Sequence, residues 1–240
     1  GNPEKLYQMW EFVEAVRGVS DACHAITLKD HPGYATPIIA GNVSFYNESK
    51  NGAIPPSPIV SCLGRLKDVN KTVPAHFQET DSTLIMIGDR KNELGGSVYY
   101  SLKNELGANV PKPNLEEVKN QLFALTDCID DGLVLSCHDI ADGGIASALA
   151  EMTFRNSIGC NVNIESDLSP DKILFSETGG FVLEVLPKNI DVIRSVFSNY
   201  CLDVFDIGST GGKSIEINGL TDIYVNETKK AWTNGLREKL

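Results

Sequence analysis

The sequence lacks the signatures of several large protein classes. Its six cysteines include no C-x-x-C pair, so neither a cysteine zinc site nor a disulfide framework is predicted. No apolar run reaches the roughly 18 residues of a membrane-spanning helix, and the chain does not open with a secretory leader pattern. Lys and Arg number 21 against 32 Asp and Glu, for a net charge of -11, and a nucleic-acid binder would instead carry a basic stripe. We therefore expect a cytoplasmic protein with reduced thiols, bound to neither nucleic acid nor membrane.

The common nucleotide and nucleophile motifs are also missing. The chain has no G-x-x-x-x-G-K-[S/T] and no G-x-G-x-x-G after a predicted strand, so a nucleotide would need another binding architecture. No histidine is paired with a Ser or Cys nucleophile in a recognisable local pattern. None of the four is therefore predicted to be catalytic; they are His24, His31, His76 and His138.

Apolar periodicity predicts a mixed α/β fold in two domains. Helices are expected after Pro3 and over 94–106, 115–129, 143–155, 190–200 and 227–239. Strands are expected over 36–40, 59–66, 82–88, 132–137, 160–164, 180–186, 204–209 and 213–217 and near 223. The run Pro111-Lys112-Pro113-Asn114 predicts a domain boundary, with domains over residues 1–110 and 114–240.

A first loop of interest is Ala40-Gly41-Asn42-Val43-Ser44-Phe45-Tyr46-Asn47. Gly41 allows a ligand to approach the backbone closely, and Asn42 and Ser44 supply oxygen donors. The alternative, which composition alone favours, is a turn of small polar residues.

A second loop, His138-Asp139-Ile140-Ala141-Asp142-Gly143-Gly144, joins a predicted strand to a predicted helix. Free N–H groups at a helix start suit a phosphate, and Asp139 and Asp142 are hard oxygen donors for magnesium. The alternative is that Asp142 only caps the helix and His138 only packs in the loop.

A third segment, Leu174-Phe175-Ser176-Glu177-Thr178-Gly179-Gly180, precedes an apolar strand. Glu177 in this segment could bind a ligand amine or a magnesium-bound water. The alternative is that Glu177 is only a surface carboxylate.

These motifs together resemble the phosphoribosylformylglycinamidine synthase family of purine biosynthesis. The runs that carry the resemblance are Gly1-Asn2-Pro3-Glu4, Met9-Trp10-Glu11-Phe12, Gly41 to Asn47, Glu93-Leu94-Gly95-Gly96-Ser97, His138 to Gly144 and Leu174 to Glu177. They occur in the family's order and span the whole chain. The chain resembles the second, C-terminal of two tandem units, beginning after that unit's first strands.

The resemblance implies a fold like that of aminoimidazole ribonucleotide synthetase. Each unit would have an N-terminal α/β domain, which pairs with a partner to form a β-barrel, and a C-terminal α/β domain. The implied ligase uses ATP and Mg²⁺ to convert formylglycinamide ribonucleotide and ammonia into the amidine, with ADP and phosphate released. Its partners would be the first half of the synthase, or a homodimeric copy, and a glutaminase subunit or domain that supplies ammonia.

The resemblance also implies roles for individual residues. Gly41 would contact ATP, Asn42 would ligate magnesium, and Ser44 would touch the substrate. Asp139 and Asp142 would ligate magnesium at an auxiliary nucleotide site, where Ser176 and Glu177 would also lie; these seven residues are the predicted site residues. The catalytic histidines would belong to the first unit, so the chain alone is expected to be inactive.

Two other functions stay open. One is a non-catalytic nucleotide-binding or assembly module of the same superfamily. The other is a stand-alone, kinase-like homodimer, which the expected lack of the first strands disfavours because a barrel edge would be left unpaired.

Overall fold

The computed structural model describes residues 1–235. Its backbone contacts divide the chain into two compact units, Gly1–Lys67 (unit 1) and Asp68–Leu240 (unit 2). Among the described residues, no helix combines the length and the apolar character that crossing a membrane requires.

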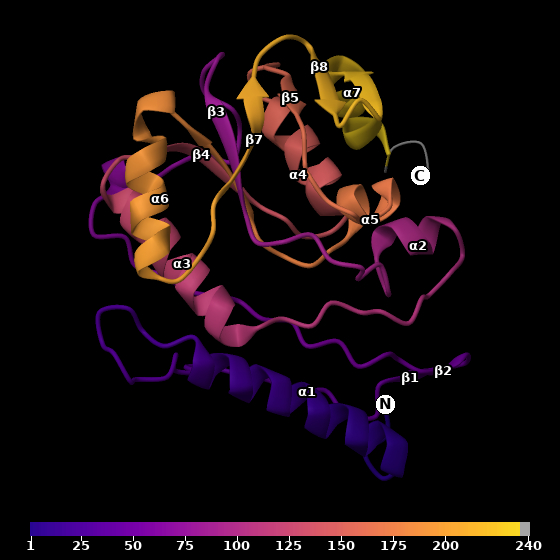
Figure 1. Ribbon diagram of the computed structural model, residues 1–240. Helices are drawn as coiled ribbons and strands as arrows, with labels where there is room; N and C mark the ends of the chain where they lie inside the picture. The colour runs from indigo at the N-terminus through magenta and orange to yellow at the C-terminus, as the bar shows by residue number, and fades with distance from the viewer. Residues whose placement is uncertain (236–240) are drawn as a thin grey trace. The chain divides into compact units, whose positions relative to one another are not determined.

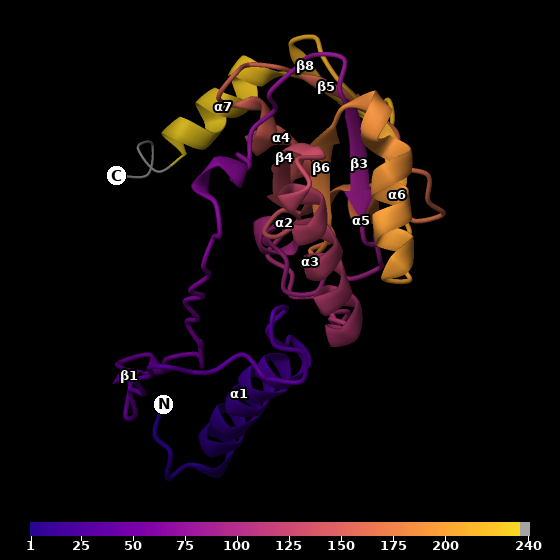
Figure 2. The ribbon, with the colours of Figure 1, turned by 90° about the vertical axis from the view of Figure 1, so that its left-hand side faces the viewer.

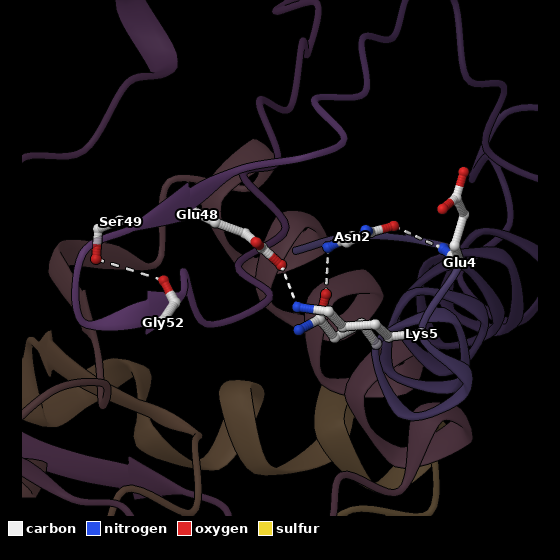
Figure 3. A network of polar contacts seen from close by, with 7 residues as sticks. Asn2, Glu4, Lys5, Glu48, Ser49 and Gly52 are labelled. Atoms are coloured by element: carbon white, nitrogen blue, oxygen red, sulfur yellow. Dashed lines mark hydrogen bonds and ion pairs between the residues drawn. The ribbon is translucent and has the colours of Figure 1, made fainter.

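Unit 1 is built on one long helix. Helix α1 (Leu6–Ala25) confirms the helix expected after Pro3, and strands β1 (Glu48–Ser49) and β2 (Gly52–Ala53) form a small antiparallel hairpin. The ammonium of Lys5 donates to Glu48 Oε1 at 2.8 Å. Figure 3 shows this contact beside the bond from the Glu4 N–H to Asn2 Oδ1 (2.9 Å), so the hairpin is tied to the start of α1.

Outside α1 and the hairpin, the described residues of unit 1 form only an isolated antiparallel bridge between Thr27 and Ala35. The strands expected over 36–40 and 59–66 are wrong, because neither segment forms a ladder with any residue that the structure describes. A strand needs a hydrogen-bonding neighbour as well as an apolar sequence. No residue of 1–67 is buried, so unit 1 contains no hydrophobic core of its own.

Unit 2 contains most of the regular structure. Its helices are α2 (Val98–Leu102), α3 (Leu115–Asp130), α4 (Gly144–Thr153), α5 (Pro170–Phe175), α6 (Ile190–Asn199) and α7 (Val225–Asn234), with 3-10 turns η1 (Val69–Lys71) and η2 (Pro187–Asn189). Its strands are β3 (Thr83–Ile87), β4 (Val134–Asp139), β5 (Cys160–Val162), β6 (Phe181–Val185), β7 (Phe205–Thr210), β8 (Ser214–Ile217) and β9 (Thr221–Tyr224).

The seven strands form one mixed sheet in the order β4-β6-β3-β7-β5-β8-β9. All neighbours are antiparallel except β5 and β8. Figure 1 shows α3 and α6 on one side of the sheet and α4 and α5 on the other. This mixed α/β layering confirms the predicted fold class in its broad form, whereas the barrel-forming domain stays a prediction.

The interior strand β3 is buried on both faces. Leu84 and Met86 pack into the cluster that includes Ile145 of α4, while Ile85 and Ile87 pack with α3 and α6 on the opposite face. Figure 2 turns α3 and α6 toward the viewer, with the strands behind them. Alternation of side chains along a strand explains how one apolar run fills two cores.

Several predicted bounds differ from those observed. The helix expected over 94–106 is confined to α2, because Gly95 and Gly96 lie in the turn before its cap, Ser97. Helix α5 begins at Pro170 and was not predicted. Helix α7 covers the first part of the segment expected over 227–239; positions 236–239 lie outside the described residues.

The contact-based division of the chain lies elsewhere than the boundary expected at Pro111–Asn114. Strand β3 precedes that segment, yet it pairs with β6 and β7, which follow it. The sheet therefore extends across the Pro-rich segment, and the division into 1–110 and 114–240 stays a prediction about domains.

One buried carboxylate fastens the segment before β3 to the sheet. The side chain of Glu184, on β6, is fully buried. Its Oε2 accepts from the Gln78 N–H and the Ser136 hydroxyl, each at 2.7 Å, and its Oε1 accepts from the Glu79 N–H at 2.9 Å. Three donors offset the cost of burying the charge.

Glu184→Gln is therefore expected to lower the free energy of unfolding by about 1–3 kcal/mol, because an amide nitrogen replaces one acceptor and leaves a buried donor unpaired. Urea denaturation measures the change. Glu165→Gln is the matched control, since Glu165 is exposed. Equal stability of both variants and the wild type would contradict the assigned role of Glu184.

Candidate functional site

The segment from Asp139 to Gly144 joins β4 to α4, as the sequence predicted. The N–H of Ile140 donates to the carbonyl of Gly180 at 2.8 Å, so this loop lies beside the loop that begins at Ser176. Gly144 has φ +67°, and a Cβ there would lie 2.5 Å from the carbonyl oxygen of Leu174. Glycine at 144 is what allows α4 to start this close to the end of α5.

The carboxylate of Glu177 accepts hydrogen bonds at the N-termini of two helices. Its Oε1 accepts from the N–H of Gly143 and from the N–H of Val98, each at 2.9 Å. Gly143 is the cap residue of α4 and Val98 is the first residue of α2. A carboxylate is favourable at a helix N-terminus because of the partial positive charge there.

Two expectations for this loop are corrected. Gly143, rather than Asp142, is the cap of α4, and no side chain of the cap residue bonds to the helix. Two N–H groups at the helix start are not free, because Gly143 donates to Glu177 and Gly144 donates to the carbonyl of Ala141 at 3.0 Å. These two N–H groups are therefore not available to a phosphate.

Asp139 and Asp142 are both exposed at this loop. The neighbouring His138 has Nδ1 2.7 Å from the carbonyl of Asp139 and Nε2 3.3 Å from Glu151 Oε2, so it tethers β4 to α4. Within residues 1–235, no group of three or more His, Cys, Asp or Glu side chains gathers as a metal site. Magnesium commonly needs only one or two carboxylates when phosphate and water complete its shell, and the magnesium ligation predicted for Asp139 and Asp142 stays a prediction.

Ser176 is buried, unlike the aspartates. Its hydroxyl lies 2.7 Å from the hydroxyl of Thr178 and donates to the carbonyl of Glu93 at 3.4 Å. A nucleotide would reach this hydroxyl only if the loop opened. The predicted ligand contact of Ser176 stays a prediction.

Arg90 lies beneath the same loop and was not predicted. Its guanidinium donates to the carbonyls of Ser176 and Gly179. Burial lowers the pKa of Arg90 to about 10, against the opposing effects of the Asp89 and Glu93 carboxylates, so the side chain stays charged at neutral pH. A buried charge paired with carbonyls rather than a carboxylate is uncommon, and no local sequence pattern marks it.

Gly41, Asn42 and Ser44 lie in the extended part of unit 1 and are exposed. A Cβ at Gly41 would meet nothing within 4 Å, so the glycine is not required by contacts within the described chain. Space is therefore open beside this backbone, as a close ligand approach needs.

Cavities lie next to these loops rather than at the predicted residues. A hollow of about 690 Å³ is lined by the end of β3 with Asp89 to Lys91, by Asn163 to Ser166 and by Val204 to Gly208. A cavity of about 40 Å³ is lined in part by Lys91, Lys112 and Thr178 to Gly180. None of the seven predicted site residues lines either one.

Comparison with protein families gives one match. The model described as AIR synthase related protein, C-terminal domain, matches residues 79–218, which is more than half of the chain. The match begins shortly before β3 and ends after β8, so it covers every strand of the sheet except β9, together with the loop after β4 and the loop before β6.

Curated relatives match nearly the whole chain. A phosphoribosylformylglycinamidine synthase subunit PurL from Methanothrix thermoacetophila is 38% identical over 247 residues, covering 100% of this chain and 32% of the relative. The subunit of the same name from Moorella thermoacetica is 36% identical, covering 98% of this chain and 32% of the relative. The chain thus spans about a third of the length of the curated relatives it matches.

Solved structures show the same fold at low sequence identity. Thermotoga maritima PurL complexed with FGAR aligns with a TM-score of 0.58 at 16% identity, covering 67% of this chain and 30% of that one. The same protein complexed with ATP aligns with a TM-score of 0.54 at 17% identity, covering 67% and 28%. With the family match, these comparisons show that the chain belongs to the AIR synthase related family through its C-terminal domain.

Proposed function

We propose that the chain is the C-terminal part of an ATP-dependent, amidine-forming ligase of purine biosynthesis that works in the cytoplasm. The single observation that carries the proposal is the alignment of 98–100% of the chain with one third of relatives named as phosphoribosylformylglycinamidine synthase subunits. The reaction would convert formylglycinamide ribonucleotide, ammonia and ATP into the amidine, ADP and phosphate.

The solved relatives support the proposed ligands. Thermotoga maritima PurL is described in complexes with ATP, ADP and FGAR and within a PurLQS assembly. By analogy we propose that this chain works with the first half of the synthase, or with a second copy, and with a glutaminase that supplies ammonia.

In unit 1 we propose that Gly41 lies against ATP, Asn42 ligates magnesium and Ser44 contacts the substrate. The exposure of all three supports these roles, because no residue of the described chain covers them. The amide oxygen of Asn42 and the hydroxyl of Ser44 suit a hard cation and a polar substrate.

In unit 2 we propose an auxiliary magnesium–nucleotide site at the start of α4. The exposed carboxylates of Asp139 and Asp142 would hold magnesium, and Ser176 and Glu177 would border the nucleotide. Magnesium, when bound, offsets the charge of the phosphate groups. Oε1 of Glu177 is committed to two backbone N–H groups, so only its Oε2 would face a ligand.

A second candidate function is a non-catalytic assembly module. The observation that favours it is the complete lack of buried side chains in residues 1–67. Large apolar side chains stand exposed along α1, among them Leu6 (90%), Trp10 (56%) and Val13 (41%). Such a patch on a helix is typical of a surface that packs against another protein.

Magnesium–ATP is expected to raise the melting temperature of the chain, and Asp139→Asn is expected to abolish the rise. At a hundredfold excess over the dissociation constant, binding adds about 2.7 kcal/mol of stability, which corresponds to several degrees for a chain of this size. Differential scanning fluorimetry, with and without a chelator, measures the shift.

Asp222→Asn is the matched control for that measurement, because Asp222 is an exposed aspartate on β9. The control should keep the full shift. A shift of equal size in the Asp139 variant would rule out this aspartate as a magnesium ligand.

The 240-residue chain alone is expected to release no ADP from formylglycinamide ribonucleotide, ammonia, ATP and magnesium, because the catalytic histidines are proposed to lie in the other half. A coupled assay for ADP, with a full-length relative as the positive control, tests this. Turnover by the chain alone would favour the stand-alone enzyme instead.

The isolated chain is also expected to dimerise or aggregate at micromolar concentration, because association buries the apolar side chains of α1. Light scattering measures the mass. Trp10→Glu should shift the chain toward the monomer, whereas Asp21→Asn, an exposed change on the same helix, should not. A monomeric wild type would argue against the assembly surface.

A further inference from the structure

The loop that carries Ser176 and Glu177 is held in place by the buried guanidinium of Arg90. Arg90 is only 7% exposed. Its Nη1 donates to the carbonyl of Ser176 at 3.3 Å and its Nη2 donates to the carbonyl of Gly179. The guanidinium therefore spans both ends of the four-residue segment Ser176–Gly179. Its Nε has no hydrogen-bond partner in the described residues, so both hydrogen bonds that this guanidinium makes there go to that segment.

The approach of the loop to Arg90 depends on a glycine. Gly180 has φ +105°, and a Cβ there would lie 2.2 Å from the carbonyl oxygen of Ile87 and 3.2 Å from Arg90 Nη2. Gly179, with φ +95°, has nothing within 4 Å of its Cβ position. The close packing is thus specific to position 180, where the loop meets the end of β3.

Glu177 connects this loop to the two helices. Its Oε1 accepts from Gly143 and from Val98, while its Oε2 has no hydrogen-bond partner within the described part of the chain. Movement of the loop would therefore move the carboxylate away from both N–H groups. The second link, from the Ile140 N–H to the Gly180 carbonyl, ties the loop to the segment that carries Asp139 and Asp142.

We infer that Arg90 is a positioning residue for the auxiliary site: its guanidinium fixes the Ser176–Gly179 segment, and that segment fixes Glu177 and the start of α4. This inference rests on the proposed magnesium–nucleotide site for its functional part. Two fixed donors in one plane are what a guanidinium offers and an ammonium does not. Arg90 would touch neither nucleotide nor metal.

The test uses Arg90→Lys, Glu177→Ala and the double variant in the full chain. Amide hydrogen exchange at Gly143 and Val98, followed by NMR, reports the two N–H groups that Glu177 holds. Arg90→Lys should speed exchange at both by about tenfold, while Leu183 in β6 should change far less, because local opening is separable from global unfolding. Arg194→Lys, at an exposed position on α6, is the matched control and should change none of them.

The double variant tests the route through Glu177. If Arg90 acts by placing Glu177, then Arg90→Lys adds nothing to the exchange at Gly143 and Val98 once Glu177 is Ala, since both changes break one connection. Additive effects, or equal acceleration at Leu183, would overturn the inference and leave Arg90 a general core residue. If Arg90→Lys does not fold, Glu177→Ala alone decides whether these amides depend on the carboxylate; unchanged exchange would reject the link.

Nucleotide binding gives the functional readout. Arg90→Lys should weaken magnesium–ATP about tenfold or more, as changes behind a metal site commonly do. Unchanged affinity beside a wild type that binds would refute the positioning role. Failure of the wild type to bind would instead refute the proposed site. Because the exchange measurement contains no nucleotide, that measurement would still decide whether Arg90 holds the Ser176–Gly179 segment.

Discussion

Burial of β3 on both faces is the constraint from which the rest of unit 2 follows. Four of its five residues, Leu84 to Ile87, alternate between two cores, and β6 and β7 pair with its two edges. A strand enclosed in this way cannot slip in register without exposing a core. The position of Gly88, where the chain leaves the sheet, is therefore fixed. The backbone of Gly180 packs closely against it: a Cβ added to Gly88 would lie 3.3 Å from the Cα of Gly180. The loop after β4 and the loop before β6, which carry the candidate site in unit 2, lie next to this end of β3.

The contact between these two loops also determines which ligands they can bind. The start of α4 resembles an anion site in sequence, yet Glu177 already supplies the negative charge there. An added phosphate would have to compete with a carboxylate that is part of the chain. Cation binding meets less opposition, because the carboxylates of Asp139 and Asp142 are exposed, although Asp139 Oδ1 lies 3.4 Å from His138 Nδ1. The electrostatics thus favour a nucleotide that arrives with its magnesium over a bare phosphate.

Sequence reasoning succeeded where structure is locally encoded. The amphipathic period over 115–129 predicted α3 almost to its observed end at Asp130, and the apolar run over 180–186 predicted β6. It failed over 36–40 and 59–66, because a strand depends on a partner that local sequence cannot supply. Arg90 was missed for the same reason, since it bonds to Ser176, 86 residues away in sequence. The resemblance to a family supplied candidate residues that spacing alone would have assigned to caps and turns.

The two groups of candidate residues differ in how far the chain itself organises them. Asp139, Asp142 and Glu177 stand on loops fastened to a buried sheet, so their backbone is set before any ligand arrives. Asn42 and Ser44 stand on a segment of unit 1 that has no buried side chain and no ladder partner in the described residues. Ordering such a segment costs conformational entropy that burial must offset. We therefore expect the site in unit 2 to form within the isolated chain, and the site in unit 1 to form only when a partner covers its apolar surface.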